Sequence, residues 1–255
     1  MAGKIYAEVK LVEKQALSDE FIRLVLEGNE VSGFPPDALG GYVKLLFDHA
    51  QKPLLSLEHL DTDGFKPVMR SYTTSMHDGN TLAIDVFCDK AGGVAANWAS
   101  AAEPGDRIVI VGPGKSQPLP SAYDSFFIVG DETAVPAISV QLQARPDARG
   151  ICVVQSKSGL ISPDVLPEGM ALVMVDGDSG GGEALVDAAL AQFWPEGKVY
   201  VWAACEFEQM RALRRYFRQQ KLVAREDMYI SSYWKRGETD EGNKRAKKLD
   251  AEADL

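Results

Sequence analysis

Four consecutive residues, Arg70-Ser71-Tyr72-Thr73, combine a guanidinium, an aromatic ring and hydroxyls in one short run. They lie in an extended stretch over residues 66–75, and residues i and i+2 of a strand point to the same face. Arg70 and Tyr72 are therefore expected to project together, with a guanidinium that can fork onto a phosphate and a ring that can lie flat on an isoalloxazine. Thr73 offers a hydroxyl and a backbone N–H to the redox-active edge of a flavin. Taken alone, such residues more often belong to an ordinary amphipathic strand.

A glycine pair followed by an alanine-rich stretch, residues 92–99, predicts a second cofactor contact. Glycines before a short helix expose backbone N–H groups at the positive end of the helix dipole, where anions bind. A flavin dinucleotide has a pyrophosphate that fits such a site. A plain loop-to-helix turn has the same pattern.

Two other glycine-containing stretches are weaker candidates. Gly114-Lys115-Ser116 is not a P-loop, because Val109 stands where that motif needs its first glycine and prolines follow. Residues 176–182 resemble a dinucleotide-binding loop but do not match its glycine spacing. We interpret this second stretch as a flexible connection.

The elements that must position these residues fall into two halves. The first half predicts short strands with glycine- and proline-containing turns at residues 5–11, 21–26, 42–47, 66–75, 82–89 and 107–111. Strands of this kind and spacing are typical of a small antiparallel barrel. We predict a six-stranded antiparallel β-barrel over residues 1–116.

The second half alternates strands and helices. Strands are predicted at residues 125–130, 151–155, 171–175, 198–203 and 228–231, and helices at 133–144, 183–193 and 206–219. The first of these strands is apolar throughout, as a strand buried in a parallel sheet must be. The alternation predicts a doubly wound parallel-sheet domain over residues 123–237, joined to the barrel by a proline-rich linker at 113–122. A charged helix or tail is predicted over 238–255.

The loop after the first strand of this domain holds further candidates. Asp131, Thr133 and Ala134 lie between the first strand and the first helix, where doubly wound folds bind ligands. Trp234 follows the last predicted strand at the same edge of the sheet, and a core position is equally open for it. Lysines and arginines near the C-terminus stand out in a chain that is otherwise acidic.

Composition limits the function. The chain has 255 residues and a formal net charge of −10, so no overall electrostatic footprint for nucleic acid exists. No apolar run reaches the roughly 18 residues of a membrane span. The three cysteines and three histidines are spaced unlike a disulfide framework or a metal site. We expect a cytoplasmic, soluble monomer without a metal site, membrane insertion or nucleic-acid partner.

Five segments in order resemble the siderophore-interacting protein family, FAD-containing ferric-siderophore reductases related to ferredoxin-NADP reductases. They are residues 42–47; 70–73; 92–99 with 104–106 and 112–113; 130–137; and 232–237. The resemblance spans nearly the whole chain. It implies an FAD-binding barrel followed by an NAD(P)H-binding domain, with an anionic ferric siderophore as the substrate.

The resemblance also assigns residues. It implies that Arg70, Tyr72 and Thr73 hold the flavin and that Ala95, Asn97 and Trp98 lie near the phosphates of FAD. The candidate FAD contacts on the same predicted elements are completed by Ser71, Asp85, Phe87, Asp89, Gly93 and Val94. The basic set that receives the siderophore is implied to be Lys44, Lys235 or Arg236, and Lys247 or Lys248.

Three positions depart from the family pattern. Ser75 replaces a usual arginine, Asp89 replaces a frequent histidine, and Ala204-Cys205-Glu206 replaces Ala-Gly-Glu. The first two concern individual FAD contacts. The third lies where nicotinamide would approach, and it leaves the choice between NADH, NADPH and ferredoxin as donor open.

The implied chemistry needs no catalytic side chain. One electron converts siderophore-bound Fe(III) to Fe(II), which hard oxygen ligands hold far more weakly, and a flavin links a hydride donor to this one-electron acceptor. One rival is a flavoprotein reductase whose partner is a ferredoxin or flavodoxin, which would fit the tail lysines equally well. The other rival is a siderophore carrier without a redox role, which predicts a colourless protein.

Overall fold

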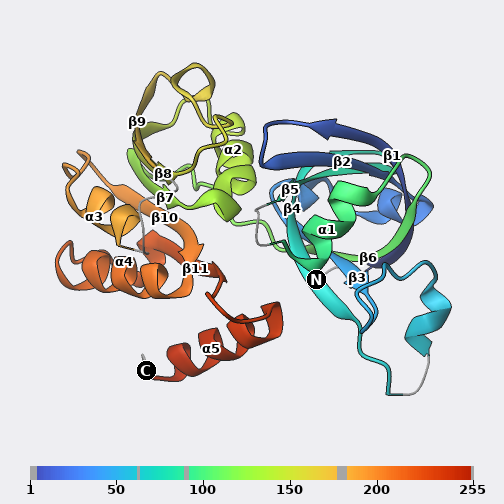
Figure 1. The fold of residues 1–255 in the computed structure, drawn as a ribbon. Helices are drawn as coiled ribbons and strands as arrows, with labels where there is room; N and C mark the ends of the chain where they lie inside the picture. Colours follow the sequence, from blue (N-terminus) through green and yellow to red (C-terminus); the bar gives the residue numbers. More distant parts are fainter. Residues whose placement is uncertain (1–4, 62–63, 89–91, 177–182, 254–255) are drawn as a thin grey trace. The chain divides into compact units, whose positions relative to one another are not determined.

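The computed structural model describes residues 5–61, 64–88, 92–176 and 183–253 of the 255-residue chain. The chain divides into two compact units, residues 1–117 and residues 118–255 (Figure 1). No helix in the described part is both long enough and apolar enough to cross a membrane.

The first unit is a closed barrel of six antiparallel strands. The strands are β1 (Ile5–Ala16), β2 (Phe21–Glu27), β3 (Tyr42–Phe47), β4 (Val68–Asp78), β5 (Thr81–Phe87) and β6 (Arg107–Gly114). They are hydrogen-bonded in the order β1-β2-β5-β4-β3-β6, and β6 closes on β1. The predicted six-stranded antiparallel barrel is confirmed.

The barrel core follows from strand alternation. Ala7, Val9 and Leu11 of β1 are buried, while Glu8 and Lys10 between them are not. Helix α1 (Val94–Ala101) adds its apolar side to the same core. The remaining helical elements of this unit are the short 3₁₀ turns η1 (Asn29–Gly33), η2 (Pro36–Ala38) and η3 (Leu57–Asp61).

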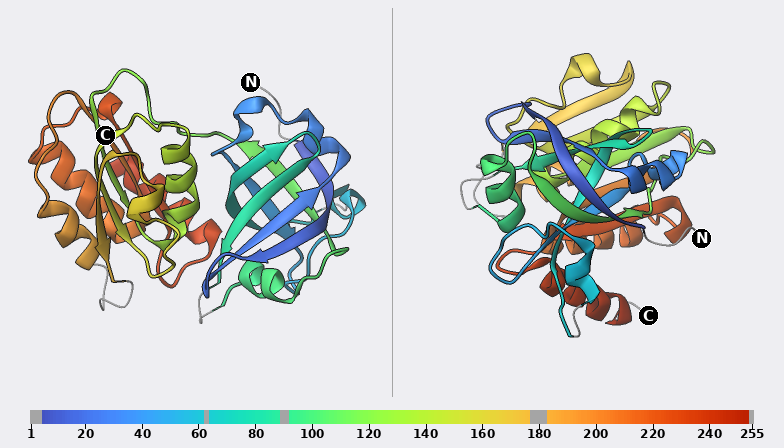
Figure 2. Two further views of the ribbon diagram at one scale, coloured as in Figure 1. Left: turned by 90° about the horizontal axis from the view of Figure 1, so that it is seen from above. Right: turned by 90° about the vertical axis from the view of Figure 1, so that its right-hand side faces the viewer.

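The second unit is a parallel sheet of five strands with helices on both faces (Figure 2). Its strands are β7 (Ser125–Gly130), β8 (Arg149–Gln155), β9 (Gly169–Val175), β10 (Val199–Glu206) and β11 (Met228–Trp234). The helices are α2 (Val135–Gln143), α3 (Ala184–Leu190), α4 (Phe207–Gln219) and α5 (Asp240–Ala253), with 3₁₀ turns η4 (Glu132–Ala134), η5 (Pro163–Val165) and η6 (Arg225–Asp227). Helix α2 covers one face and α3 and α4 cover the other. The predicted doubly wound sheet is confirmed.

The strand order predicts at which edge of the parallel sheet a ligand binds. The order is β11-β10-β7-β8-β9, so the chain moves outward from β7 to β9 and then returns to β10 on the other side. Ligands of such sheets bind at the carboxyl ends of the strands, at the point where the order reverses. Strands β7 and β10 meet at this point and end at Gly130 and Glu206.

Several element boundaries differ from the sequence predictions, among them the end of β1 at Ala16 instead of residue 11 and that of β10 at Glu206 instead of residue 203. Strand β11 continues to Trp234 instead of ending at residue 231, because β10 extends far enough to pair Glu206 with Trp234. Strand β6 continues to Gly114, which lies under the ring of Tyr42 where a side chain would clash. Helix α3 ends at Leu190 instead of residue 193. The stretch 177–182 of the suggested dinucleotide loop lies outside the described residues.

Candidate functional site

Strand β3 sets the direction of the first candidate residues on β4. Val43 pairs with Tyr72 and Leu45 pairs with Arg70, so these side chains share the face on which Val43 and Leu45 are buried. Tyr72 packs against the barrel core. The guanidinium of Arg70 donates a hydrogen bond to the carbonyl of Met69 at 2.8 Å. Arg70 and Tyr72 therefore lie on one face, as strand alternation requires.

Lys44 and Thr73 lie on the opposite face of the same strand pair. Lys44 pairs with Ser71, and Tyr42 pairs with Thr73. The ammonium of Lys44 lies 5.5 Å from the centre of the Tyr42 ring. Among the predicted flavin contacts, Ser71 and Thr73 are thus the ones that share a face with the predicted siderophore lysine.

Two hydroxyls next to these residues lack a hydrogen-bond partner among the described residues. They are Thr74 Oγ1 and Ser75 Oγ. Thr74 is fully buried, and its backbone N–H and carbonyl are bonded to Gly41 and Gly40. An unsatisfied buried hydroxyl costs about 1–3 kcal/mol. The described residues hold three other such atoms, Glu20 Oε2, Trp202 Nε1 and Gln209 Oε1, so a missing partner indicates a ligand contact only beside other candidate residues.

The N-terminus of α1 is the candidate phosphate site. Gly92 has a φ of +69°, in the left-handed region that favours glycine. Gly93 precedes the first helical residue, and no side chain in the described part caps this end of the helix. The side chain of Asn97 lies over Gly92, since a Cβ there would come within 2.9 Å of Asn97 Oδ1. The helix end therefore presents backbone N–H groups and one exposed amide, which suits an anion.

The other candidates on α1 face inward. Val94, Ala95 and Trp98 are buried in the barrel core, and the Trp98 ring contacts Phe47 edge-on with ring centroids 6.3 Å apart. Contact of a phosphate with these three residues would therefore come from the backbone. Their side chains hold α1 on the barrel.

The candidates on β5 have partners inside the barrel. Arg23 Nε and Nη2 donate to the two oxygens of Asp85 at 2.7 and 2.8 Å, which ties β2 to β5. This pairing raises the pKa of Arg23 above its usual value. The ring of Phe87 packs against that of Phe21 in a tilted arrangement, with 5.3 Å between ring centroids. Asp89 lies outside the described residues.

In the second unit, Asp131 joins the ends of three neighbouring strands. It follows β7 and accepts hydrogen bonds from Thr133 N at 3.0 Å, Thr133 Oγ1 at 2.6 Å and Trp234 Nε1 at 2.7 Å. The backbone N–H of Glu206, at the end of β10, also acts to lower the pKa of this carboxylate. Burial raises the pKa of Asp131, and the hydrogen bonds from Thr133 and Trp234 oppose that effect. Ala134, the other candidate in this loop, is fully buried.

Glu206 makes a second buried centre at this edge. Its carboxylate accepts from the backbone N–H groups of Glu208 at 2.5 Å and Gln209 at 3.4 Å, which caps α4. It also accepts from the backbone N–H of Arg236 at 3.1 Å. Cys205 beside it is fully buried with a free thiol whose pKa is raised, chiefly by burial. The cysteine that departs from the family pattern thus packs into the core of this unit.

The basic candidates differ in how they are held. Lys235 Nζ lies 4.0 Å from the centre of the Phe207 ring and 3.4 Å from Glu208 Oε1. Lys247 Nζ donates to Ser231 Oγ at 2.8 Å and to the Ser232 carbonyl at 3.0 Å, and burial lowers its pKa. Lys248 is 80% exposed. Of the two tail lysines, Lys248 points to solvent and Lys247 holds α5 on β11.

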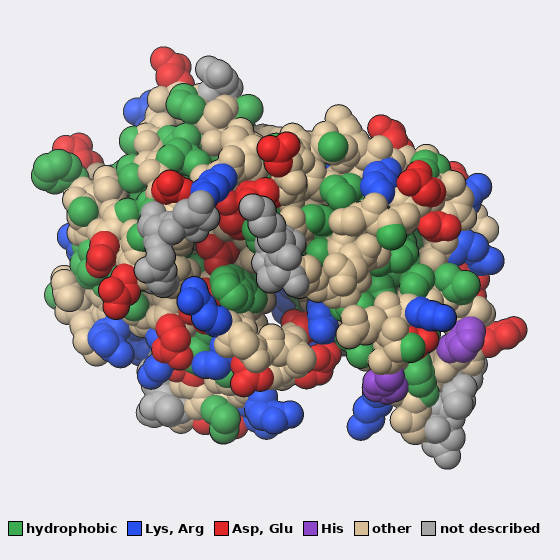
Figure 3. Space-filling view, in the orientation of Figure 1, with side chains coloured by type: hydrophobic (Ala, Val, Ile, Leu, Met, Phe, Trp, Pro, Cys, Tyr) green, Lys and Arg blue, Asp and Glu red, His purple; other side chains and the backbone are tan. Residues whose placement is uncertain are grey.

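Sequence reasoning missed the contacts that dock α5. Buried Asn243 accepts from Ser232 Oγ at 2.8 Å. Asp250 pairs with Arg211 at 3.1 Å and Arg214 at 2.6 Å, both on α4. The available signal was spacing, since residues 243, 247 and 250 share one side of a helix. Figure 3 shows blue and red side chains interspersed over α4 and α5, as such paired charges require.

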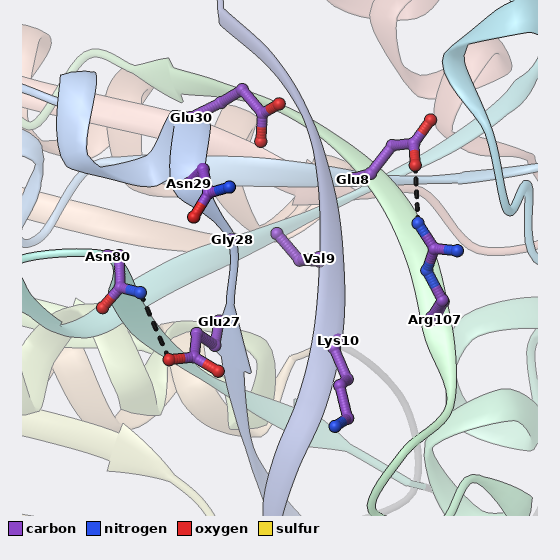
Figure 4. Close-up of a pocket in the computed structure, with 9 residues that line it drawn as sticks. All are labelled: Glu8, Val9, Lys10, Glu27, Gly28, Asn29, Glu30, Asn80 and Arg107. Carbon is purple, nitrogen blue, oxygen red and sulfur yellow. Dashed lines mark hydrogen bonds and ion pairs between the residues drawn. The ribbon is translucent and has the colours of Figure 1, made fainter.

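A shallow pocket between β1 and β2 lies away from all predicted site residues (Figure 4). Its polar lining includes an ion pair between Arg107 and Glu8 at 2.6 Å and a hydrogen bond from Asn80 to Glu27 at 3.2 Å. The described residues contain no group of three or more potential metal ligands.

Family models match both units. The model of the siderophore-interacting FAD-binding domain matches residues 10–117, and that of the siderophore-interacting protein matches residues 123–237. The ferric vibriobactin reductase ViuB of Vibrio cholerae is 30% identical over 242 residues, which cover 90% of this chain and 89% of that relative. The NADPH-dependent ferric-chelate reductase of Escherichia coli is 28% identical over 240 residues, covering 90% and 92%.

Solved structures agree with these matches. The siderophore-interacting protein SipS from Aeromonas hydrophila has a TM-score of 0.81 and 25% identity, and the alignment covers 97% of this chain and 98% of that one. The ferredoxin reductase in carbazole 1,9a-dioxygenase has a TM-score of 0.64 at 16% identity over 91% of this chain and 68% of its own. The second likeness concerns the fold alone.

Proposed function

Because this chain belongs to the siderophore-interacting protein family, we propose that it is an FAD-dependent ferric-siderophore reductase. Electrons pass from NAD(P)H to siderophore-bound Fe(III), and Fe(II) is released. One hydride carries two electrons, so one donor molecule reduces two ferric ions. Fe(II) leaves because the oxygen ligands of a siderophore hold it far more weakly than Fe(III).

The observation that carries this proposal is the set of unsatisfied groups around β4. Thr74 Oγ1 and Ser75 Oγ lack partners among the described residues, and they follow directly on Arg70-Ser71-Tyr72-Thr73. The uncapped start of α1 in the same unit suits a pyrophosphate. These residues fit FAD, which when bound supplies the link between a two-electron donor and a one-electron acceptor.

The assignment of roles follows this fit. Arg70 would hold a phosphate of FAD, Tyr72 would pack on the flavin ring, and the hydroxyls of Thr73 and Ser75 would offer hydrogen bonds to the flavin. The FAD-binding domain is residues 1–116, the NAD(P)H-binding domain is residues 123–237, and residues 238–255 form the C-terminal helix. In the second domain the loop after β7, with Thr133 and Ala134, is the side from which the dinucleotide donor approaches.

The siderophore is bound by cations. Lys44, Lys235, Arg236 and Lys248 are the residues that we assign to this role, because ferric catecholates carry net negative charge. A unit pair about 4 Å apart attracts by roughly 4 kcal/mol at an effective dielectric near 20, and exposed lysines contribute less. Lys247 supports the set indirectly by holding α5 on β11.

We also propose that the protein acts in the cytoplasm as a monomer. Reduced nicotinamide dinucleotides are available there, and the three free cysteines suit a reducing compartment. A ferredoxin is the alternative donor.

Anaerobic mixing tests the donor and the cofactor together. Purified protein is combined in turn with NADH, NADPH and reduced ferredoxin while the flavin absorbance is followed, and a ferric catecholate is then added with a dye specific for Fe(II). We expect a yellow protein that a dinucleotide bleaches and that then forms Fe(II). A colourless protein supports the carrier. Bleaching without Fe(II) formation supports a reductase with a protein partner.

A further inference from the structure

Two buried carboxylates reach the end of β11 from two other strands. Asp131 follows β7, and Glu206 is the last residue of β10. Both side chains are nearly inaccessible, with 6% relative exposure each. They contact the same short segment, Trp234 to Arg236, which lies at and just beyond the end of β11.

Asp131 fixes the indole of Trp234. The Nε1–H group donates to Asp131 Oδ2 at 2.7 Å, a short distance typical of a bond to a charged acceptor. Trp234 nevertheless remains 37% exposed. One edge of the ring is therefore anchored while part of its surface stays open to a ligand.

The two basic residues of the segment are held from the other side. Glu206 accepts the backbone N–H of Arg236 at 3.1 Å and leaves the guanidinium exposed. The ammonium of Lys235 lies over the Phe207 ring at 4.0 Å. Phe207 directly follows Glu206, so the residue that fixes the backbone of Arg236 also begins the helix that holds Lys235.

We propose that Asp131 and Glu206 are positioning residues, which hold Trp234, Lys235 and Arg236 in one arrangement for binding the anionic ferric siderophore. This inference rests on the proposed function. Neither carboxylate touches the ligand, because each already accepts at least three hydrogen bonds within the protein. They act through the indole and through the backbone.

Each acid also caps a helical element, since Asp131 accepts from Thr133 N at the start of η4 and Glu206 accepts from Glu208 N at the start of α4. Capping does not need the further bonds to Trp234 Nε1 and Arg236 N. Placing carboxylates in the interior is costly, and apolar residues of similar size often stabilise a fold as well or better. The raised pKa of Asp131 reflects that cost, which its hydrogen bonds only oppose. The acids contribute a fixed orientation. The hydrogen bond to Asp131 holds the partly exposed indole of Trp234 in one orientation, which packing alone would leave free.

The test compares Asp131→Asn, Trp234→Phe and the double variant in the purified protein as isolated. The indole N–H resonance of Trp234, assigned by its loss in Trp234→Phe, is expected to move upfield in Asp131→Asn. The KM for a ferric catecholate is expected to rise about tenfold, equivalent to about 1.4 kcal/mol. In the Trp234→Phe background the same substitution is expected to change KM less than about twofold, because its route of action is gone.

Asp147→Asn is the matched control. Asp147 is a 70% exposed acid of the same unit, and it pairs with Arg145 at 2.9 Å. In the Asp147→Asn variant, the Trp234 indole resonance and the KM for the ferric catecholate should equal those of the wild type. Glu206→Gln gives an independent test, with a shift of the Arg236 amide resonance and a rise of KM. If Asp131→Asn does not fold, the inference is tested with Glu206→Gln and Trp234→Phe, and an unchanged KM in both variants overturns it.

The failures are distinguishable. An unmoved Trp234 resonance and an unchanged KM in Asp131→Asn overturn the inference while reductase activity stands. Equal effects of Asp131→Asn in both backgrounds overturn it too, since the acid would then act independently of the indole. Wild-type protein that does not reduce ferric chelates overturns the proposed function, whatever the resonance shows.

Discussion

At β4 of the barrel, buried hydroxyls of Thr74 and Ser75 have no partner among the described residues, whereas at the carboxyl edge of the parallel sheet Asp131 and Glu206 are each fully engaged. Both regions contain predicted site residues. Because an unsatisfied buried polar group costs free energy, the first region is the one in which a new hydrogen-bond partner would stabilise the protein. In the second region both acids are satisfied, although Gln209 Oε1 beside them lacks a partner among the described residues.

This difference distinguishes residues that touch a ligand from residues that hold the structural elements in place. Predicted residues with satisfied groups, such as Asp85 with Arg23 and Lys247 with Ser231, hold elements together. Predicted residues with exposed groups, such as Asn97 and Lys248, are the better candidates for touching ligands. Each prediction below tests this division.

The largest effect is expected from Arg70→Ala. Loss of a charged contact to the pyrophosphate should raise the Kd for FAD roughly 100-fold, from about 3 kcal/mol of lost interaction. Fluorescence titration of flavin-free protein measures it. Arg107→Ala is the control, because this arginine pairs with Glu8 elsewhere on the barrel and should leave FAD affinity unchanged. Equal losses in both variants would mean that Arg70 acts only on barrel stability.

Lys44→Ala should raise the KM for an anionic ferric chelate about tenfold, as loss of one partly exposed cation at close range predicts. Flavin content should stay normal. The exposed barrel residue Lys10 supplies the control variant Lys10→Ala, with unchanged kinetics. An unchanged KM in Lys44→Ala would remove this lysine from the substrate site.

Thr74→Val is expected to stabilise the flavin-free protein and to weaken the binding of FAD. Without FAD, removal of an unsatisfied buried hydroxyl should increase the free energy of unfolding by about 1 kcal/mol. With FAD, loss of the partner should weaken binding about fivefold. Denaturant unfolding and flavin titration measure the two effects. A variant destabilised in the flavin-free state would show that the hydroxyl is already satisfied.

Substitution of Lys247 and of Lys248 should have modest effects on two different properties, stability and chelate binding. Lys247→Ala should lower the free energy of unfolding by about 1–2 kcal/mol, since it leaves Ser231 and the Ser232 carbonyl without their donor. Lys248→Ala should leave stability unchanged and raise the chelate KM about twofold. The reverse assignment would contradict the division between support and contact.

The smallest effect concerns a satisfied pair near the surface of the second unit. Tyr123 Oη donates to Asp227 Oδ1 at 2.7 Å, and this bond raises the pKa of Tyr123 to about 12 from the ordinary value of 10.0. Since the folded-state pKa is the higher one, the stabilisation is present below pH 10 and is lost as the pH rises toward about 12. In Asp227→Asn the absorbance titration of Tyr123, identified with Tyr123→Phe, should move toward 10. An unmoved midpoint would contradict this cause.

Much of the fold could be predicted because its signals are local. Alternation gave the barrel strands, and the apolar run at 125–130 indicated a strand buried on both faces, which is β7. The end of β11 could not be found locally. Ser232 to Trp234 are polar or aromatic, and only pairing with β10 keeps them in the sheet.

The candidate site was predicted less completely. Residue types at β4 and α1 indicated which side chains suit a flavin, but not which ones the protein itself engages. The bond between Asp131 and Trp234 joins residues about a hundred positions apart, and no spacing rule reveals it. The inward turn of Lys247 likewise depends on Ser231 across a helix–strand contact.

The most direct test of the account follows electrons to iron. Anaerobic protein, reduced with one equivalent of NAD(P)H per flavin, is mixed with a ferric catecholate in a stopped-flow instrument while flavin absorbance and Fe(II) are recorded together. The account predicts that flavin absorbance returns as two Fe(II) form per flavin, because two stored electrons meet a one-electron acceptor. A protein that binds no flavin, or a reduced flavin that the chelate leaves unchanged, would contradict it.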